Sequence, residues 1–309
     1  MNGRVFFGNK RNLFIFAMLC TILWGIGFPM IKLGYQYLHI NSEDVYSKLL
    51  FAGVRFFAAG VLTIGVTSAA DRKIPAIKGR MCRDIFVLAL VQTVGQYAFQ
   101  YIGLANVKGM IGSILNQINV FLLVFISPLF FREEKLSLSK TIGSIIGMIG
   151  IVIINFNGSF EFSFHLTGEG FIILASLFAA AGIILCKKLT AHYRPIVVAG
   201  YQQMFGGLLL LLTGIAGGGK LYITDIYGAF VLVFLCGSAA LTNLLWTVLL
   251  KYNPVYEVSV YKFGVPVFGT IASAMILNEN MASFQVLSAL LCVAAGIYIV
   301  NGAGKKVKI

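Results

Sequence analysis

The sequence has little charge, and almost no acidic charge inside its apolar segments. Only 11% of the 309 residues are charged, against roughly 25% in soluble proteins. No Asp or Glu lies in the middle of any long apolar segment, and Glu257 alone enters one, at its edge. With 59% hydrophobic residues, the composition excludes an ordinary soluble domain, and the missing acids argue against a proton relay built on carboxylates.

Metal and disulfide chemistry also find little support. The cysteines are odd in number and scattered singly, with no metal-ligand spacing; they are Cys20, Cys82, Cys186, Cys236 and Cys292. No nucleophile with a neighbouring base and no soluble output domain is visible. We therefore expect no cofactor and no metal, and an intramembrane enzyme or sensor is the weakest of the functions considered.

What the chain does contain is long apolar segments. A membrane-spanning helix needs about 20 apolar residues, and ten windows approach this length: 13–33, 48–68, 85–104, 110–131, 140–156, 170–187, 196–215, 227–250, 256–277 and 284–301. The sequence therefore predicts an all-α membrane protein with ten transmembrane helices.

Two segments of the chain are copies of one pattern. Residues 133–155 align without a gap on residues 279–301, at an offset of 146, with six of 23 positions identical. Because each copy closes a unit of five helices, an odd number, the second unit enters the membrane from the opposite side. We expect two inverted repeats, at 1–156 and 170–309, joined by an extracytoplasmic linker at 157–169, and transport by alternating access.

The basic residues are distributed on one side. With the N-terminus in the cytoplasm, 18 of the 24 Lys and Arg residues fall in inner segments, whereas only Lys32, Lys48, Lys108 and Lys220 fall in outer ones. Lys and Arg are retained on the cytoplasmic side, so both termini are expected there, in a multi-pass protein of the inner membrane. The net charge of +13 reflects this topology, and nucleic-acid binding is a poor explanation of it.

Polar residues inside the predicted spans suggest a binding cavity. Gln96 lies at mid-depth in the third span, Asn116 and Asn119 share a face of the fourth, and the offset of 146 places Asn116 on Lys262 in the ninth. Intramembrane cations usually face protein or a water-filled cavity. Lys262 either reaches the cytoplasmic interface as a snorkelling lysine or binds a substrate carboxylate or phosphate, and the amides either join helices or contact substrate.

Aromatic residues and one arginine complete the candidate site. Trp24, Tyr97 and Trp246 offer surface that lines a pocket or packs helices together. Arg55 lies in the second span, opposite Gln203 by local similarity, and both are expected to have a structural or gating role. Asp44 or Glu43 is a candidate ion-pair partner for Arg55.

The motifs resemble one known family. The first span reads ILWGIGFPMIK, and the blocks that run through both repeat copies carry an acidic residue after the fourth and ninth spans, at Glu133 and Glu279. In these respects, over about residues 13–302, the chain resembles the EamA-domain group of the drug/metabolite transporter superfamily. The resemblance implies ten helices, with the first four of each repeat around a central cavity and the fifth at the periphery.

The resemblance also implies transport of small metabolites, with amino-acid export common among bacterial relatives. Small multidrug relatives depend on a membrane glutamate in the first helix, where this chain has Trp24, Gly25 and Gly27. We therefore expect an exporter of a small carboxylate-bearing solute such as an amino acid, in contact with membrane lipid and compatible with a homodimer. The alternatives are a flippase for an anionic lipid or lipid-linked sugar and, far behind, a membrane sensor or enzyme.

Overall fold

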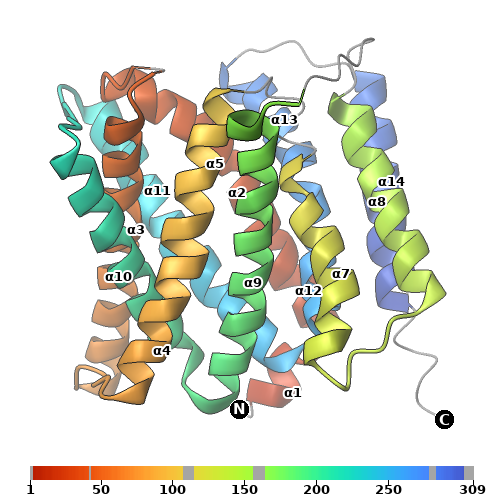
Figure 1. The fold of residues 1–309 in the computed structure, drawn as a ribbon. Coiled ribbons are helices and arrows are strands. Elements are labelled where there is room, and N and C mark those ends of the chain that lie inside the picture. The colour runs from red at the N-terminus through yellow and green to blue at the C-terminus, as the bar shows by residue number, and fades with distance from the viewer. Residues whose placement is uncertain (1–2, 42, 107–114, 156–163, 278–282, 303–309) are drawn as a thin grey trace.

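The computed structural model describes residues 3–41, 43–106, 115–155, 164–277 and 283–302. The described residues form a bundle of long helices that run side by side (Figure 1). In chain order the elements are α1 (Gly3–Phe7), α2 (Lys10–Tyr37), α3 (Val45–Asp71), α4 (Arg80–Ala89), the π-helix η1 (Leu90–Gly95), α5 (Gln96–Ala105), α7 (Ile118–Phe130), α8 (Leu138–Asn155), the π-helix η2 (Leu166–Gly170), α9 (Phe171–His192), α10 (Pro195–Ala216), α11 (Ile226–Tyr252), α12 (Val255–Ser259), the 3-10 helix η3 (Val260–Phe263), α13 (Gly264–Leu277) and α14 (Ser283–Gly302).

Eight helical stretches of the described chain are long and apolar enough to cross a membrane. Two shorter apolar helices, α7 and α8, occupy the places of the fourth and fifth predicted spans. The fourth window, 110–131, begins in residues outside the described ranges. The all-helical, multi-pass prediction is therefore confirmed, with eight full-length spans and two shorter helices.

Several helices extend beyond the predicted windows. α2 continues to Tyr37 and α3 already begins at Val45, so Lys32 and Lys48 lie within these helices. The windows ended where polar residues began, whereas a helix continues through polar residues that face a polar interior. Residues 166–169, the last part of the predicted linker, are also helical and lead directly into α9.

The closest helix pairs rely on glycine. α3 packs along α10, and a Cβ at Gly207 would lie 2.2 Å from the backbone nitrogen of Phe57. α8 packs along α14, where a Cβ at Gly296 would lie 2.6 Å from the carbonyl oxygen of Gly143. Small residues let membrane helices approach to this distance.

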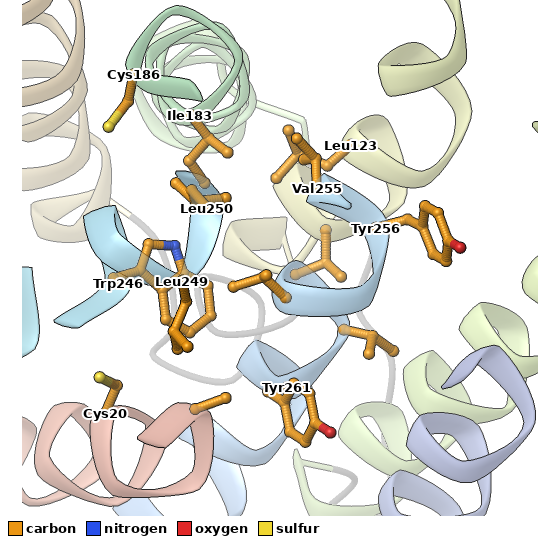
Figure 2. Packing of buried hydrophobic residues seen from close by; sticks show 14 of the residues in the cluster. Cys20, Leu123, Ile183, Cys186, Trp246, Leu249, Leu250, Val255, Tyr256 and Tyr261 are labelled. Carbon is orange, nitrogen blue, oxygen red and sulfur yellow. The ribbon is translucent and has the colours of Figure 1, made fainter. Parts of the chain in front are cut away.

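The remaining major contacts connect helices from different halves of the chain. α2 packs against α11 and α13, and α9 packs against α5 and α7. At the end of the bundle that contains α1 and the start of α2, which we call the N-terminal end, an apolar cluster fills the interior. Figure 2 shows Leu123, Ile183, Leu250 and Val255 meeting there, each from a different helix, with Trp246 at the edge of the cluster.

Candidate functional site: a cationic cavity within the bundle

A cavity of about 630 Å³ lies among the helices. It is lined by residues of both halves of the chain, and all nine residues singled out in the sequence are among them: Trp24, Arg55, Gln96, Tyr97, Asn116, Asn119, Gln203, Trp246 and Lys262. The structure thus brings the predicted residues to one place. Their contact with a substrate stays a prediction.

Lys262 is held in the cavity by two tryptophans. Its Nζ lies 5.3 Å from the ring centroid of Trp24 and 5.3 Å from that of Trp246. The two indoles meet edge to face, with centroids 4.7 Å apart. A desolvated cation over an indole gains about 2 kcal/mol. This contact favours the cavity position of Lys262 over the snorkelling position.

The local backbone explains how Lys262 reaches this place. The helix that begins at Val255 is interrupted by the 3-10 segment η3, which contains Lys262, before it continues as α13. α2 approaches α13 closely because Gly25 has no side chain; a Cβ there would lie 2.7 Å from the Cβ of Phe268. Trp24, the neighbour of Gly25, is thereby brought to the lysine.

The cavity is charged with one sign only. Four of its lining residues are basic, Lys32, Lys48, Arg55 and Lys262, and none of the described lining residues is Asp or Glu. Arg55 is buried, and burying a cation without a counter-charge costs several kcal/mol. An anion is therefore the ligand that the lining favours most.

A row of amides follows the wall formed by α4, η1 and α5. Gln92, Gln96 and Gln100 all line the cavity, although the π-helical turn of η1 between Gln92 and Gln96 breaks the regular α-helical spacing that their sequence positions suggested. π-turns within helices often mark functional sites.

Two amide side chains of α10 join helices: Gln203 donates from Nε2 to the carbonyl oxygen of Ala239 at 3.2 Å, and Gln202 donates to the Thr93 hydroxyl. The Asn119 side chain donates locally, to the Asn116 carbonyl. Several buried polar atoms of the lining have no partner among the described residues: Gln100 Oε1, Gln117 Oε1, Asn119 Oδ1, Gln203 Oε1 and Trp246 Nε1. Buried polar atoms normally have partners, so the described residues leave these hydrogen-bonding groups unsatisfied.

Arg55 is buried, with 9% of its surface exposed. Its Nε donates to the carbonyl oxygen of Leu235 at 3.3 Å, and its guanidinium lies 5.3 Å from the ring centroid of Phe56. The expected ion pair with Asp44 or Glu43 is not formed. Asp44 instead begins α3, where its carboxylate accepts from the Ser47 backbone nitrogen at 2.9 Å and from the Ser47 hydroxyl at 2.6 Å. These hydrogen bonds lower the pKa of the Asp44 carboxyl.

Some of the lining was missed from sequence. Lys32, Tyr35, Lys48, Gln202 and Asn243 also line the cavity. A signal for part of this set exists in α2, where Trp24, Phe28, Ile31 and Tyr35 recur at the spacing of one helix face and all line the cavity. The first predicted span already contained Lys32, and extending it by one turn would have included Tyr35.

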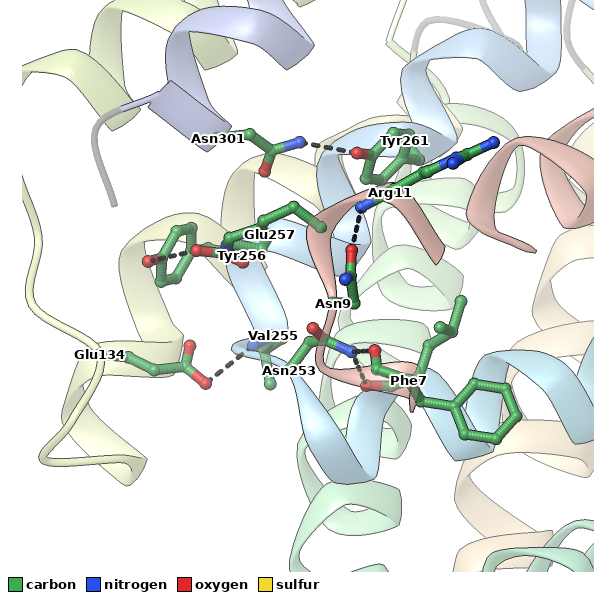
Figure 3. A network of polar contacts seen from close by, with 12 residues as sticks. Phe7, Asn9, Arg11, Glu134, Asn253, Val255, Tyr256, Glu257, Tyr261 and Asn301 are labelled. Atoms are coloured by element: carbon green, nitrogen blue, oxygen red, sulfur yellow. Dashed lines mark hydrogen bonds and ion pairs between the residues drawn. The ribbon is translucent and has the colours of Figure 1, made fainter. Parts of the chain in front are cut away.

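The N-terminal end of the bundle is closed by polar contacts centred on the start of α12 (Figure 3). Oε1 of Glu134 accepts from the backbone nitrogen of Val255 at 2.7 Å and from Nζ of Lys187 at 2.7 Å. Glu257 pairs with Lys10. Asn253 donates to the carbonyl of Phe7 at 2.9 Å. These contacts tie α12 to α1, α2, α9 and the loop after α7.

The cavity extends in the opposite direction. Its lining residues on α2 run from Trp24 to Tyr35, the half of the helix remote from Lys10, and Lys32 in that half is exposed. Between Trp24 and the N-terminal end, the interior is filled by the apolar cluster of Figure 2. The structure is thus closed at the N-terminal end and accessible from the other.

These features define a class: a polytopic membrane protein with a polar cavity between its helices. The model of the EamA-like transporter family matches residues 12–156 and, again, residues 166–302. The chain belongs to this family, within the drug/metabolite transporter superfamily, and the resemblance noted in the sequence is confirmed. It is therefore a membrane transporter, and its family indicates a transporter rather than an enzyme.

Individual relatives agree with this assignment. A "Probable amino-acid metabolite efflux pump" of Salmonella typhimurium is 25% identical over 299 residues, covering 92% of each chain. The "Uncharacterized transporter YvbV" of Bacillus subtilis is 26% identical, covering 96% of this chain and 94% of its own. One crystal structure superposes with a TM-score of 0.80 at 14% identity, covering 97% of this chain and 100% of its own, which shows a shared fold.

Proposed function

We propose that the protein exports a small organic solute bearing a carboxylate, such as an amino acid or a related metabolite. The observation that carries the proposal is Lys262, which lies in an acid-free cavity between Trp24 and Trp246. The substrate carboxylate binds the ammonium, and the unpartnered Nε1–H of Trp246 donates to the same group. The efflux-pump names of relatives support this substrate class.

The uncommitted amide oxygens of the lining complete the site. Gln203 Oε1 and Asn119 Oδ1 lack partners among the described residues, so they accept from the donors of a bound solute. An α-ammonium group supplies three such donors, and a site that hydrogen-bonds a polar group discriminates strongly against analogues lacking that group.

The architecture we propose is ten spans in two inverted repeats, residues 1–156 and 170–309, with a linker at 157–169. The helix contacts support it. Exchanging the two halves turns the contacts of α2 with α11 and α13 into those of α9 with α5 and α7, and leaves the pairs α3 with α10 and α8 with α14 in place. A twofold relation between repeats produces this pattern.

Transport follows from opening the two ends in turn. With both termini in the cytoplasm, the closed N-terminal end is the cytoplasmic one, and the present conformation faces outward. Release of the contacts of Glu134 and Glu257 around α12 opens the cytoplasmic end. The segment η3 contains Lys262 and connects α12 to α13. A solute that binds Lys262 therefore acts directly on α12, the helix held by the contacts of the closed end.

The test is counterflow of labelled amino acids in liposomes that contain the purified protein. We expect uptake by the wild type and its loss in Lys262→Met, which keeps the length of the side chain and removes its charge. Lys73→Met, the same change at an exposed position outside the cavity, should transport normally. Full activity of Lys262→Met would refute the assignment. Failure of the wild type with every amino acid would refute the substrate class and favour phosphorylated or lipid substrates.

A further inference from the structure

Arg55 has a position that the proposed function leaves unexplained. It is a buried cation whose hydrogen bond with a described residue uses only Nε, on Leu235. Both Nη groups lack partners among the described residues, and no acid is present in the described lining. A structural arginine at this depth is normally paired with a carboxylate. The guanidinium is therefore available to an anion.

The surroundings of Arg55 fit an anionic group. Tyr35, Tyr97 and Tyr101 line the cavity together with Arg55. The ring centroid of Tyr97 lies 4.6 Å from that of Phe56, against which the guanidinium packs, and 6.2 Å from that of Tyr101. Hydroxyls donate to carboxylate or phosphate oxygens, and the planar guanidinium presents paired N–H donors that match either anion. A guanidinium and phenolic hydroxyls at one place form the elements of an oxyanion site.

This site is separate from the one at Lys262. Arg55 lies on α3 and reaches α11 at Leu235, whereas Lys262 lies on η3 and is packed between α2 and α11 at the two tryptophans. One carboxylate on Lys262 leaves Arg55 without a counter-charge. A solute with one carboxylate and one ammonium adds no net charge to a lining that already contains four cations.

We infer that Arg55 is a second anion subsite, so the preferred solute carries a carboxylate and a further anionic group, either a second carboxylate or a phosphate. This inference rests on the proposed function and narrows its substrate class. The carboxylate common to amino acids binds Lys262, and the distal anion binds Arg55 with the tyrosine hydroxyls. Solutes that differ only at the distal group should therefore differ in affinity.

The experiment compares two matched pairs of probes, L-glutamate with L-glutamine and O-phospho-L-serine with L-serine. Binding to the purified full-length protein is measured by competition, and transport by counterflow. In the wild type we expect the acidic member of at least one pair to bind about tenfold or more tightly; the pair that shows the larger ratio identifies carboxylate or phosphate. Equal affinities within both pairs would overturn the inference while leaving the proposed function intact.

Variants locate the effect. Arg55→Gln should bring the ratio within each pair close to one because it weakens the acidic member far more than the neutral one, whereas Lys262→Met should weaken all four probes. Arg55→Lys keeps the charge and should keep part of the preference, and it serves if Arg55→Gln fails to fold. An undiminished ratio in Arg55→Gln would overturn the inference. If the wild type binds none of the four probes, the proposed carboxylate substrate falls with it.

Discussion

The cations of the cavity and those of the N-terminal end have opposite surroundings. At the N-terminal end Lys10 pairs with Glu257, Lys187 with Glu134, and Arg194 with Asp71. Around the cavity, four cations share a lining with no described acid. The fold thus supplies carboxylates where contacts must hold helices together and withholds them where a solute binds. The paired cations hold one end of the bundle together, and the cations of the lining give the cavity its positive charge.

The largest expected effect comes from the most buried pair. Glu134 is 2% exposed and Lys187 17%, and Glu134→Gln removes the charge from a site that also accepts from Val255. Removing one partner of a buried pair costs about 3 kcal/mol or more, so the melting temperature of the purified protein should fall clearly. Glu133→Gln, the same change at the exposed neighbour, is the control. An equal fall in both variants would contradict the role assigned to Glu134.

The second prediction places an acid in the cavity. Gln203 and Arg55 bind carbonyls about one turn apart on α11, at Ala239 and Leu235, which are separated by about 6 Å along the helix axis. Gln203→Glu therefore provides an internal counter-charge near the guanidinium. We expect L-glutamate to bind about tenfold more weakly, which corresponds to about 1.4 kcal/mol.

The neutral variant Gln203→Met distinguishes the effect of the added negative charge from the effect of losing the hydrogen bond to Ala239. It also lacks the donor to Ala239 but adds no charge, so it should weaken binding less than Gln203→Glu. If both variants behave alike in a competition assay, the single-signed charge of the cavity does not determine what it binds.

The pair at the start of α2 should contribute less. Lys10 is 52% exposed whereas Glu257 is 3% exposed, and Glu257 keeps the hydroxyl of Tyr256, which donates to it at 3.2 Å. Solvent screening at Lys10 reduces the expected loss in Lys10→Gln to about 1 kcal/mol. The difference from wild type in thermal melts should shrink as salt is added. The exposed neighbour changed in the same way, Arg11→Gln, should show no such difference.

The smallest effect is expected at the most exposed of these three pairs. Arg194 and Asp71 are 2.5 Å apart, but their side chains are 60% and 35% exposed. Surface pairs of this kind contribute little, so Arg194→Gln should melt at the wild-type temperature. A fall as large as that of Glu134→Gln would show that burial does not rank these pairs.

The features that could be predicted from the sequence are those that depend on a local pattern of residues. Apolar length located the spans, and the offset between the repeat copies connected Asn116 with Lys262, both of which line the cavity. One helix face of α2 contained the signal for Tyr35 as well. These features depend on spacing within one helix or between two copies, which a sequence displays directly.

The parts that escaped prediction depend on three-dimensional pairing. Glu134 and Lys187 are 53 residues apart, and no spacing rule indicates that the carboxylate also accepts from the first turn of α12. The partner expected for Arg55, Asp44, was wrong because an N-cap aspartate has a competing use for its oxygens in its own helix. The 3-10 segment η3 likewise has no signature in a run that reads as continuous helix.

The whole sequence contains two tryptophans, and both contact Lys262 in the cavity. Intrinsic fluorescence at the red edge of protein absorption therefore originates entirely from the lining of this cavity. An anion that draws the ammonium away from the indole faces changes the emission of both fluorophores at once. The protein carries its own optical reporter of occupancy, and a titration can be followed without a label.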